Sequence, residues 1–326
     1  MIVLLSIPQT VTAWQLPPEQ VVRLRAACPQ HEFLDARTPE ARAAGLTRAE
    51  VVCTWRLSPE EIASAPHLRW VHSTAVAAFT LSLSELAARG IVVTNTRGVQ
   101  DGPIAEHVFA TLLALGHHLP LAFERQRTAT WAQNEFQGDR LPVKLHGRRL
   151  GIIGLGAIGQ AVARLGVAFG MRVTGLRRRP ELGGPAGVTV WGPERIDDLL
   201  AASDAVVLAA PLTADTETLL DARRLALLPR GAHLVNIARG ALLDEAALVA
   251  ALASGALGGA SLDVFGVEPL PPDSPLWRAP NLIVTPHTSG FRAGHWDEVL
   301  DVFIDNLGRF ERGEALRSPV DPVRGY

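Results

Sequence analysis

The chain has 326 residues, of which 48% are hydrophobic and 20% are charged. This length predicts two domains of about 150 residues each, and this composition is typical of globular proteins with packed cores. Lysine plus arginine number 31 and aspartate plus glutamate number 33, so the formal net charge is −2. A near-neutral chain lacks the basic patch that nucleic-acid binding needs, and its apolar runs fall short of the about 18 residues that span a membrane. We therefore expect neither a nucleic-acid partner nor a membrane partner.

The few cysteines and the single lysine exclude several kinds of catalytic and structural chemistry. Cys28 and Cys53 could form at most one disulfide, which excludes a disulfide-stapled secreted protein and makes the reducing cytoplasm the expected location. The single lysine, Lys144, follows no glycine-rich loop, so Schiff-base and P-loop lysine chemistry are not expected. No Cys/His cluster has zinc spacing and no G-x-S-x-G elbow is present, so we expect neither a metal site nor a serine nucleophile.

The first hundred residues alternate short apolar runs with helical patterns. The expected strands are Ile2–Ser6, Val51–Trp55, Trp70–Ser73 and Ile91–Thr94, and the expected helices are Pro18–Cys28, Ser58–Ala65 and Leu83–Arg89. Alternation of this kind predicts β-α units around a mainly parallel sheet.

A long apolar helix is expected at Pro103–Leu119, followed by an exposed arm at Arg125–Lys144. Beyond Gly147 the β-α alternation becomes regular. The expected strands there are Leu150–Ile153, Arg172–Leu176, Ala205–Ala209, His233–Asn236, Gly259–Val264 and Leu282–Val284. The expected helices are Ala157–Phe169, Asp197–Ala202, Asp221–Leu228, Asp244–Ala253 and Arg292–Arg312. Because these strands are apolar throughout, they predict a doubly wound parallel sheet with helices on both faces.

A glycine motif, G-x-G-x-x-G, lies between one of these strands and the next helix. It places Gly154 at the tight turn, Gly156 where backbone amides can approach a pyrophosphate, and Gly159 where the helix packs on the sheet. The motif in this context predicts dinucleotide binding; the alternative is a glycine-rich turn without a ligand.

The choice of cofactor depends on the end of the next strand, about 20 residues on. An NAD enzyme carries a carboxylate there for the ribose 2′-hydroxyl, whereas this chain has Arg177, Arg178 and Arg179. Arginine would bind a 2′-phosphate by charge-assisted hydrogen bonds. We therefore favour NADP(H), with NAD(H) possible and a merely solvated arginine run as the alternative.

Polar side chains follow three later strands at the point where each one ends. These are Arg239, then Asp263 with Glu268, and finally His287. The carboxyl ends of parallel strands meet at one edge, so we expect these side chains to converge on the ligand crevice. Each also has an ordinary explanation: a charge beside a helix, a cap on backbone amides, a loop residue before proline, or a structural histidine.

Together these segments resemble the D-isomer-specific 2-hydroxyacid dehydrogenase family, which includes glyoxylate and hydroxypyruvate reductases. Further motifs in the same order support the resemblance: Ala105-Glu106-His107, Pro211-Leu212-Thr213 and Pro275-Leu276-Trp277. The resemblance implies a Rossmann domain at 99–290 and a smaller flavodoxin-like α/β substrate domain built from both chain ends, 1–98 and 291–326. It also implies an active-site cleft between the domains and a homodimer.

The family's residue roles carry over to matching positions. Arg239 would bind the substrate carboxylate and polarise the 2-oxo group, and His287 would donate a proton to the carbonyl oxygen. Glu268 would hold the imidazole and stabilise its protonated form, while Asp263 would accept from the nicotinamide carboxamide. The residues implied to line the cofactor through their backbone are Ala157, Ile158, Ala210, Ile237 and Ser289. The hydride step would need no metal, since Arg239 supplies the positive charge.

The expected substrate loop departs from the family pattern. The family has a glycine-rich turn there, whereas this chain reads Thr74-Ala75-Val76-Ala77-Ala78-Phe79. The amides of Ala75 and Val76 could still hold a carboxylate, and Phe79 is a candidate for the pocket wall. The expected activity is reduction of a small 2-oxo acid to the D-2-hydroxy acid. The alternatives are a cofactor-sensing protein of corepressor type and a formate- or phosphite-type dehydrogenase.

Overall fold

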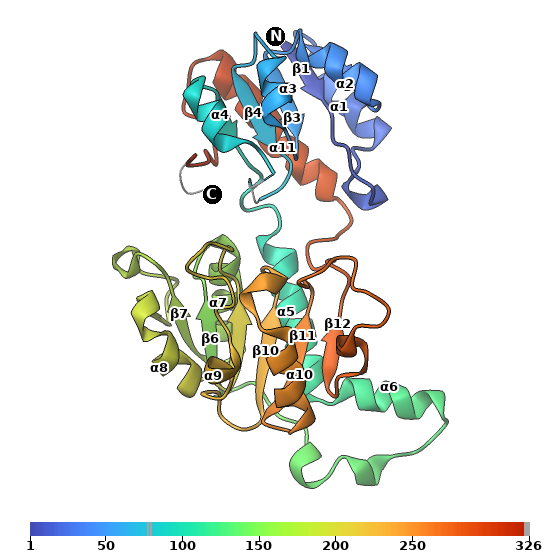
Figure 1. The fold of residues 1–326 in the computed structure, drawn as a ribbon, viewed down its shortest axis with the longest axis vertical. Coiled ribbons are helices and arrows are strands. Elements are labelled where there is room, and N and C mark those ends of the chain that lie inside the picture. The colour runs from blue at the N-terminus through green and yellow to red at the C-terminus, as the bar shows by residue number, and fades with distance from the viewer. Residues whose placement is uncertain (77, 79, 323–326) are drawn as a thin grey trace. The chain divides into compact units, whose positions relative to one another are not determined.

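A computed structural model describes residues 1–76, 78 and 80–322 of the chain. The chain divides into two compact units, residues 1–100 with 291–326 and residues 101–290. Each unit is a parallel sheet with helices packed on both of its faces (Figure 1). This architecture confirms the expected α/β class.

The described part of the first unit contains a five-stranded parallel sheet in the order β2-β1-β3-β4-β5, the flavodoxin-like order. Its strands are β1 (Ile2–Leu5), β2 (Glu32–Asp35), β3 (Val51–Thr54), β4 (Trp70–Ser73) and β5 (Val92–Thr94). Its helices are α1 (Pro18–Ala27), α2 (Pro39–Leu46), α3 (Pro59–Ala63), α4 (Leu83–Ala88) and α11 (His295–Glu311).

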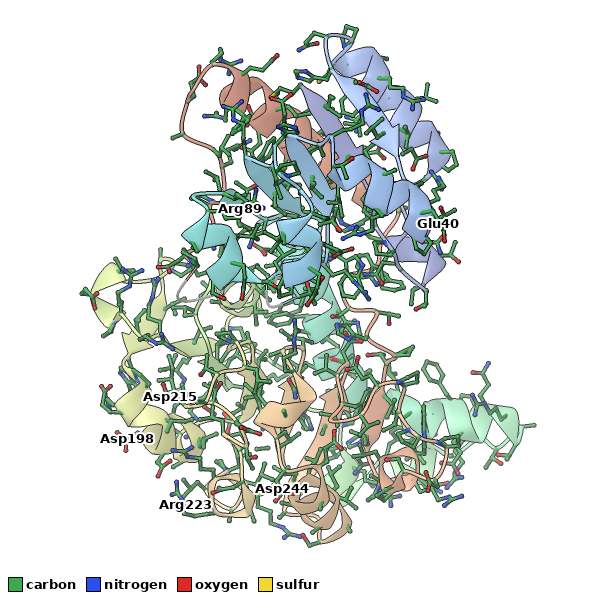
Figure 2. The ribbon with its side chains drawn as sticks, turned by 45° about the horizontal axis from the view of Figure 1, so that its top comes forward. Glu40, Arg89, Asp198, Asp215, Arg223 and Asp244 are labelled. Carbon is green, nitrogen blue, oxygen red and sulfur yellow. The ribbon has the colours of Figure 1, made fainter. Side chains whose placement is uncertain are left out.

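The continuous apolar run of β1 follows from burial on both faces. Val3 and Leu5 pack with residues of α1 and α11 in one core cluster. Leu4, which points to the opposite face, packs with residues of α2, α3 and α4 in a second cluster. Arg89, labelled in Figure 2, ties α4 to α3 by donating to the carbonyl oxygens of Ile62 and Ala65.

The described part of the second unit contains a seven-stranded parallel sheet in the order β12-β11-β10-β9-β6-β7-β8. Apart from β12, this is the doubly wound Rossmann order, which reverses direction between β6 and β9. Its strands are β6 (Arg149–Ile153), β7 (Arg172–Leu176), β8 (Val188–Trp191), β9 (Ala205–Leu208), β10 (Ala232–Asn236), β11 (Leu257–Leu262) and β12 (Leu282–Val284). Its helices are α5 (Asp101–Gly116), α6 (Leu119–Arg127), α7 (Ala157–Ala168), α8 (Ile196–Ala201), α9 (Ala222–Leu225) and α10 (Glu245–Ala253).

Two core clusters cover the two faces of this sheet. Helices α5 and α7 pack on one face, and α8, α9 and α10 pack on the other. The side chain of Asp244, labelled in Figure 2, caps α10 by accepting from the amide of Ala247 at 2.9 Å.

Strands β2 and β8 and helix α2 were not predicted from the sequence. Strands β2 and β8 lie at sheet edges, where one side of the strand has no neighbour, so their residues are mixed rather than apolar. Helix α2 consists largely of alanine, arginine and glutamate and has no apolar stripe to mark it. Its start does carry a local signal, because Thr38 accepts from the amide of Ala41 and Pro39 begins the helix.

Several predicted boundaries were wrong for local conformational reasons. The expected helix Pro103–Leu119 ends at Gly116, and α6 restarts after His118, whose φ of 51° is left-handed. The expected arm therefore begins as a helix, and α6 with the segment after it projects away from the sheet (Figure 1). The last helix starts at His295 rather than Arg292, because Gly294 has a φ of 74° that α-helix does not allow.

Strand β11 begins two residues earlier than predicted, at Leu257. The glycines at 258 and 259 both lie inside this strand, and close packing requires them. A Cβ at Gly259 would lie 2.9 Å from the side chain of Leu115 and 3.0 Å from the carbonyl oxygen of Asn281. Within the described residues, no helix is long and apolar enough to cross a membrane.

Candidate active site

The glycine motif forms the turn between β6 and α7. Gly154 has a φ of 102°, and a Cβ there would lie 2.5 Å from the amide nitrogen of Ala210. A Cβ at Gly159 would lie 2.1 Å from the carbonyl oxygen of Gly154. The first and third glycines are therefore required by close packing of the turn, β9 and α7.

Gly156, the N-cap of α7, differs from the other two glycines. A Cβ at this position would meet nothing within 4 Å, so the backbone faces open space at the start of a 12-residue helix. Unsatisfied amides and the helix dipole favour an anion there. The geometry of the turn therefore fits a dinucleotide pyrophosphate.

The arginines after β7 are arranged differently from one another. Arg177 is half-buried and its guanidinium donates to the carbonyl oxygen of Gly183, whereas Arg178 and Arg179 are exposed. Arg177 also lines an open cavity of about 670 Å³ together with Gln160 and Arg164 of α7. Positive charge is therefore concentrated beside the end of β7.

The three polar strand ends lie side by side, because β10, β11 and β12 are neighbours in the sheet. The amide of Asp263 donates to the carbonyl oxygen of Asn236 at 3.0 Å. The amide of His287 in turn donates to the carbonyl oxygen of Asp263 at 2.9 Å. The loops that follow these strands are thus linked through the backbone.

Glu268 and His287 form a direct pair. The Oε2 atom of Glu268 accepts from Nδ1 of His287 at 2.7 Å, and its Oε1 atom accepts from the amide of Phe265 at 2.9 Å. The side chain of His287 is 50% exposed and that of Glu268 is 36% exposed. Both oxygens of the carboxylate are therefore engaged, while the imidazole remains open to a ligand.

Arg239 lies on the loop after β10 and is half-buried. Burial lowers the pKa of its guanidinium, and the negative charge of Glu268 acts in the opposite direction. Gly240 follows directly, where a Cβ would lie 1.9 Å from the carbonyl carbon of Phe265. The loop that carries Arg239 thus packs against the loop that carries Glu268, which brings both residues and His287 into one region.

Asp263 is buried, with 1% of its surface exposed. Its Oδ1 atom accepts from the Thr285 hydroxyl at 2.6 Å and from the Thr288 amide at 2.9 Å, and its Oδ2 atom accepts from the Ser289 amide at 3.0 Å. These contacts match the simpler of the two expected roles, in which the carboxylate caps backbone amides.

Five residues were expected to line the cofactor through their backbone, and they lie in the loops after the strands or in the first turn of α7. Three of the residues implied to line the cofactor are buried beside the glycine turn or the strand ends: Ala210, Ile237 and Ser289. Ala157 and Ile158 are half-buried in the first turn of α7.

In the first unit, Ala75 and Val76 follow β4. The amide of Ala75 donates to the Ser73 hydroxyl at 3.2 Å, and the carbonyl of Val76 accepts from the Asn95 side chain at 2.6 Å. Phe79, expected as a pocket wall, lies outside the described residues.

Some residues at the site were missed from the sequence. Thr285 and His107 join the contacts of Asp263, with Thr285 Oγ1 lying 3.3 Å from Nε2 of His107. Glu245, at the start of α10, accepts from the amide of Gly266 at 2.7 Å and so holds the loop of Glu268. His107 lies in the Ala105-Glu106-His107 motif, which was the only signal available for it.

A doubly wound sheet with a glycine turn shaped for pyrophosphate, and an imidazole–carboxylate pair at the carboxyl ends of its strands, is the framework of a nicotinamide-dependent oxidoreductase. The comparison with known families narrows this class. Residues 109–289 match the model described as "D-isomer specific 2-hydroxyacid dehydrogenase, NAD binding domain". The chain belongs to this family and is an NAD(P)-dependent 2-hydroxyacid dehydrogenase, which confirms the resemblance noted in the sequence.

Comparison with individual relatives and solved structures supports the same family. A glyoxylate reductase of Korarchaeum cryptofilum (strain OPF8) is 36% identical over 260 residues, covering 79% of this chain and 77% of the relative. A solved D-isomer specific 2-hydroxyacid dehydrogenase from Xanthobacter autotrophicus Py2, in complex with NADPH and MES, has a TM-score of 0.81 with 31% identity and 99% coverage of each chain. An NAD-dependent formate dehydrogenase from Staphylococcus aureus, in complex with NAD, has a TM-score of 0.76 with 26% identity and 97% coverage of each chain. These two structures contain different cofactors.

Proposed function

We propose that the protein reduces a small 2-oxo acid, of the glyoxylate or hydroxypyruvate type, to the D-2-hydroxy acid. The observation that carries the proposal is the 2.7 Å contact between His287 Nδ1 and Glu268 Oε2. It lies on the same sheet edge as Arg239 and the glycine turn. The relationship to a glyoxylate reductase supports this substrate class.

The contact with Glu268 determines which imidazole nitrogen acts. A carboxylate only accepts, so Nδ1 of His287 carries the hydrogen that points to Glu268. Nε2 is left to hold the proton that passes to the carbonyl oxygen of the substrate, and Glu268 stabilises the positive charge before that transfer. In the reverse direction, Nε2 removes the proton from the hydroxyl group.

The reduced nicotinamide, when bound, supplies a hydride to C2 of the substrate. The residues that would hold the dinucleotide are Gly154, Gly156 and Gly159, with Ala157, Ile158, Ala210, Ile237 and Ser289 lining it. Hydride at carbon and a proton at oxygen together convert the 2-oxo acid into the 2-hydroxy acid, so the reaction is balanced.

Arg239 would bind the substrate carboxylate. A planar, permanently charged guanidinium suits a bidentate carboxylate contact, and its positive charge also stabilises the developing negative charge on the oxygen. We assign the substrate-binding role of the first unit to the amides of Ala75 and Val76. The Ala75 amide would exchange its Ser73 contact for the substrate.

The main test is a substrate panel read at the absorbance band of the reduced nicotinamide. Glyoxylate, hydroxypyruvate, pyruvate and longer 2-oxo acids are each tested with NADPH and with NADH. Turnover of a small 2-oxo acid to the D-isomer, identified by chiral chromatography, supports the proposal. Turnover of formate or phosphite alone would make it wrong, as would tight cofactor binding without turnover of any substrate, the behaviour of a sensing protein.

NADPH is the proposed cofactor, held at its 2′-phosphate by Arg177 and Arg178. The support is the absence of a carboxylate at the end of β7 and the positive charge there. Replacing either arginine by aspartate should lower the ratio of kcat/KM for NADPH to that for NADH by about 10- to 100-fold, because one charge-assisted contact is lost. Arg172→Asp, at the opposite end of β7, is the matched control and should keep the ratio. Equal ratios in all three variants would contradict the proposal.

We also propose a homodimer assembled through α6 and the segment that follows it. Four apolar side chains there are exposed: Leu119 (39%), Phe123 (56%), Leu141 (58%) and Trp131 (90%). Exposed apolar patches on one projecting element are typical of a protein–protein interface. The buried free thiols of Cys28 and Cys53 fit the cytoplasm as the proposed location.

A further inference from the structure

We infer that Thr285 and His107 are positioning residues for His287 and act through the buried carboxylate of Asp263. The inference rests on the proposed role of His287 as the proton donor. Neither residue was assigned a role from the sequence. Their connection to His287 is a chain of hydrogen bonds inside the second unit.

Asp263 accepts three hydrogen bonds from the backbone of the turn that carries His287. The backbone carbonyl of Asp263 accepts from the amide of His287 at 2.9 Å. Its carboxylate accepts from the next two amides, those of Thr288 and Ser289. Three consecutive amides therefore donate to one aspartate, and the His287 amide is shared with the carbonyl oxygen of Thr285 at 3.0 Å.

His287 needs this support because its φ is 53°. A residue with a Cβ pays about 1 kcal/mol or more in the left-handed region, so it stays there only when its surroundings hold it. The direction of the imidazole, and hence the place of Nε2, follows from this backbone conformation. If the turn were less rigid, the imidazole could adopt orientations in which Nε2 no longer points to the substrate.

Thr285 and His107 hold the carboxylate itself. The Thr285 hydroxyl lies 2.6 Å from Oδ1 of Asp263 and must donate, because a carboxylate only accepts. The hydroxyl is then free to accept from Nε2 of His107 at 3.3 Å. The hydrogen bonds therefore run in one direction, from the His107 imidazole to the Thr285 hydroxyl to the Asp263 carboxylate.

The direction of these hydrogen bonds determines the tautomer of the His107 imidazole. Its hydrogen must lie on Nε2, and burial lowers the pKa of the ring while the charge of Asp263 opposes that shift. A neutral Nε2–H ring donates without adding a charge to the interior. Asp263 is 1% exposed, so each lost donor leaves a buried carboxylate less well satisfied.

The experiment compares variants that keep or remove one hydrogen-bond donor. Thr285→Val preserves the shape of the side chain and removes the hydroxyl, whereas Thr285→Ser keeps the hydroxyl. His107→Phe removes the ring donor, and His107→Gln keeps an amide donor. Thr111→Val is the matched control, because Thr111 lies on the same helix as His107, is buried, and donates only to the carbonyl of Val108.

We expect Thr285→Val to lower kcat by about 10- to 100-fold while KM changes by less than about threefold, the result of a misplaced catalytic group. Thr285→Ser should restore most of the loss, and His107→Phe should lower kcat more than His107→Gln does. Thermal unfolding of each variant is measured in parallel. A structural role alone would lower the melting temperature without this separation of kcat from KM and without rescue by serine.

Two results would overturn the inference. The first is a kcat for Thr285→Val equal to that for Thr111→Val, and the second is a loss that serine does not restore. If Thr285→Val does not fold, the pair of His107 variants decides, and equal kcat values in that pair count against the inference. A His287→Ala enzyme with an unchanged kcat would instead refute the proposed function, so the two failures can be told apart.

Discussion

Glu268 is the residue on which the geometry of the proposed acid most directly depends. One oxygen of its carboxylate accepts from the amide of Phe265 and the other from His287. The loop is held in turn by Glu245, which accepts from the amide of Gly266. The imidazole is thus oriented by a carboxylate that is itself anchored to the backbone, the arrangement that keeps an acid in a productive geometry.

At this scale we predict that His287→Ala lowers kcat by about 10²- to 10⁴-fold, because the proton donor is lost. Glu268→Gln should lower kcat less, since the amide oxygen still accepts from Nδ1 but carries no charge to stabilise the imidazolium. Steady-state kinetics with a responsive 2-oxo acid measure both effects. A larger loss in Glu268→Gln than in His287→Ala would reverse the assigned roles.

At the scale of elements, the glycines of the turn between β6 and α7 have different roles, one in packing and one in ligand binding. Gly159 is needed for packing, since a Cβ there would lie 2.1 Å from a backbone oxygen. Gly156 has open space around its missing side chain. A substitution at Gly159 should therefore affect stability, whereas a substitution at Gly156 should affect ligand binding.

We predict that Gly159→Ala lowers the free energy of unfolding by about 1–3 kcal/mol, because the methyl group forces backbone apart. Gly156→Ala should leave stability almost unchanged and weaken NADPH binding by about tenfold, or about 1.4 kcal/mol, because the methyl group lies where phosphate would approach. Urea unfolding and a fluorescence titration with NADPH provide the two measurements. The prediction fails if Gly156→Ala binds NADPH as the parent does.

A second prediction at this scale concerns the projecting helix α6 and the segment after it. If the proposed homodimer forms, replacing Phe123 and Trp131 together by serine should convert it into a monomer, because the apolar surface proposed for its interface is removed. Light scattering after size-exclusion chromatography measures the mass. Val22→Ser, which changes an equally exposed residue on α1, is the control and should remain dimeric. A parent protein that is already monomeric would end the homodimer proposal.

At the scale of the whole molecule, each unit contains an imidazole whose pKa is well below its usual value: His72 is buried and His233 is half-buried. Burial lowers the pKa of His72, on β4, to about 3. Burial and the nearby charges of Arg148 and His118 lower the pKa of His233, on β10, to about 4. Between about pH 4 and pH 6.5 the unfolded chain binds protons at both positions, whereas the folded chain does not.

Stability should therefore be greatest above about pH 6.5 and decrease as the pH falls toward 4, by up to about 1.4 kcal/mol per pH unit for each histidine. His72→Phe and His72→Asn should both reduce that slope by the same amount, although their absolute stabilities will differ because Phe303 and Trp70 pack against the ring. Urea unfolding at a series of pH values measures the slope. Slopes equal to that of the parent in both variants would contradict the prediction.

Much of this molecule could be predicted from local patterns. Three of the strands that hold the site, β6, β7 and β10, were predicted to within one residue at each end, because apolar runs and turn residues mark them. The glycine spacing, with Gly154 and Gly159, indicated a dinucleotide turn for the same reason. Edge strands such as β8 were missed because their residues do not show burial on two faces.

The sequence by itself determined the fold class, the family and the pairing candidates Glu268 and His287, since these depend on residue type and spacing along the chain. The tertiary structure alone decided what Asp263 contacts, because its partners depend on how β11 and β12 align and on where α5 packs against them. Thr285 and His107 are 178 positions apart, and nothing local connects them. Hydrogen bonds between distant residues follow from packing, so only the folded chain reveals them.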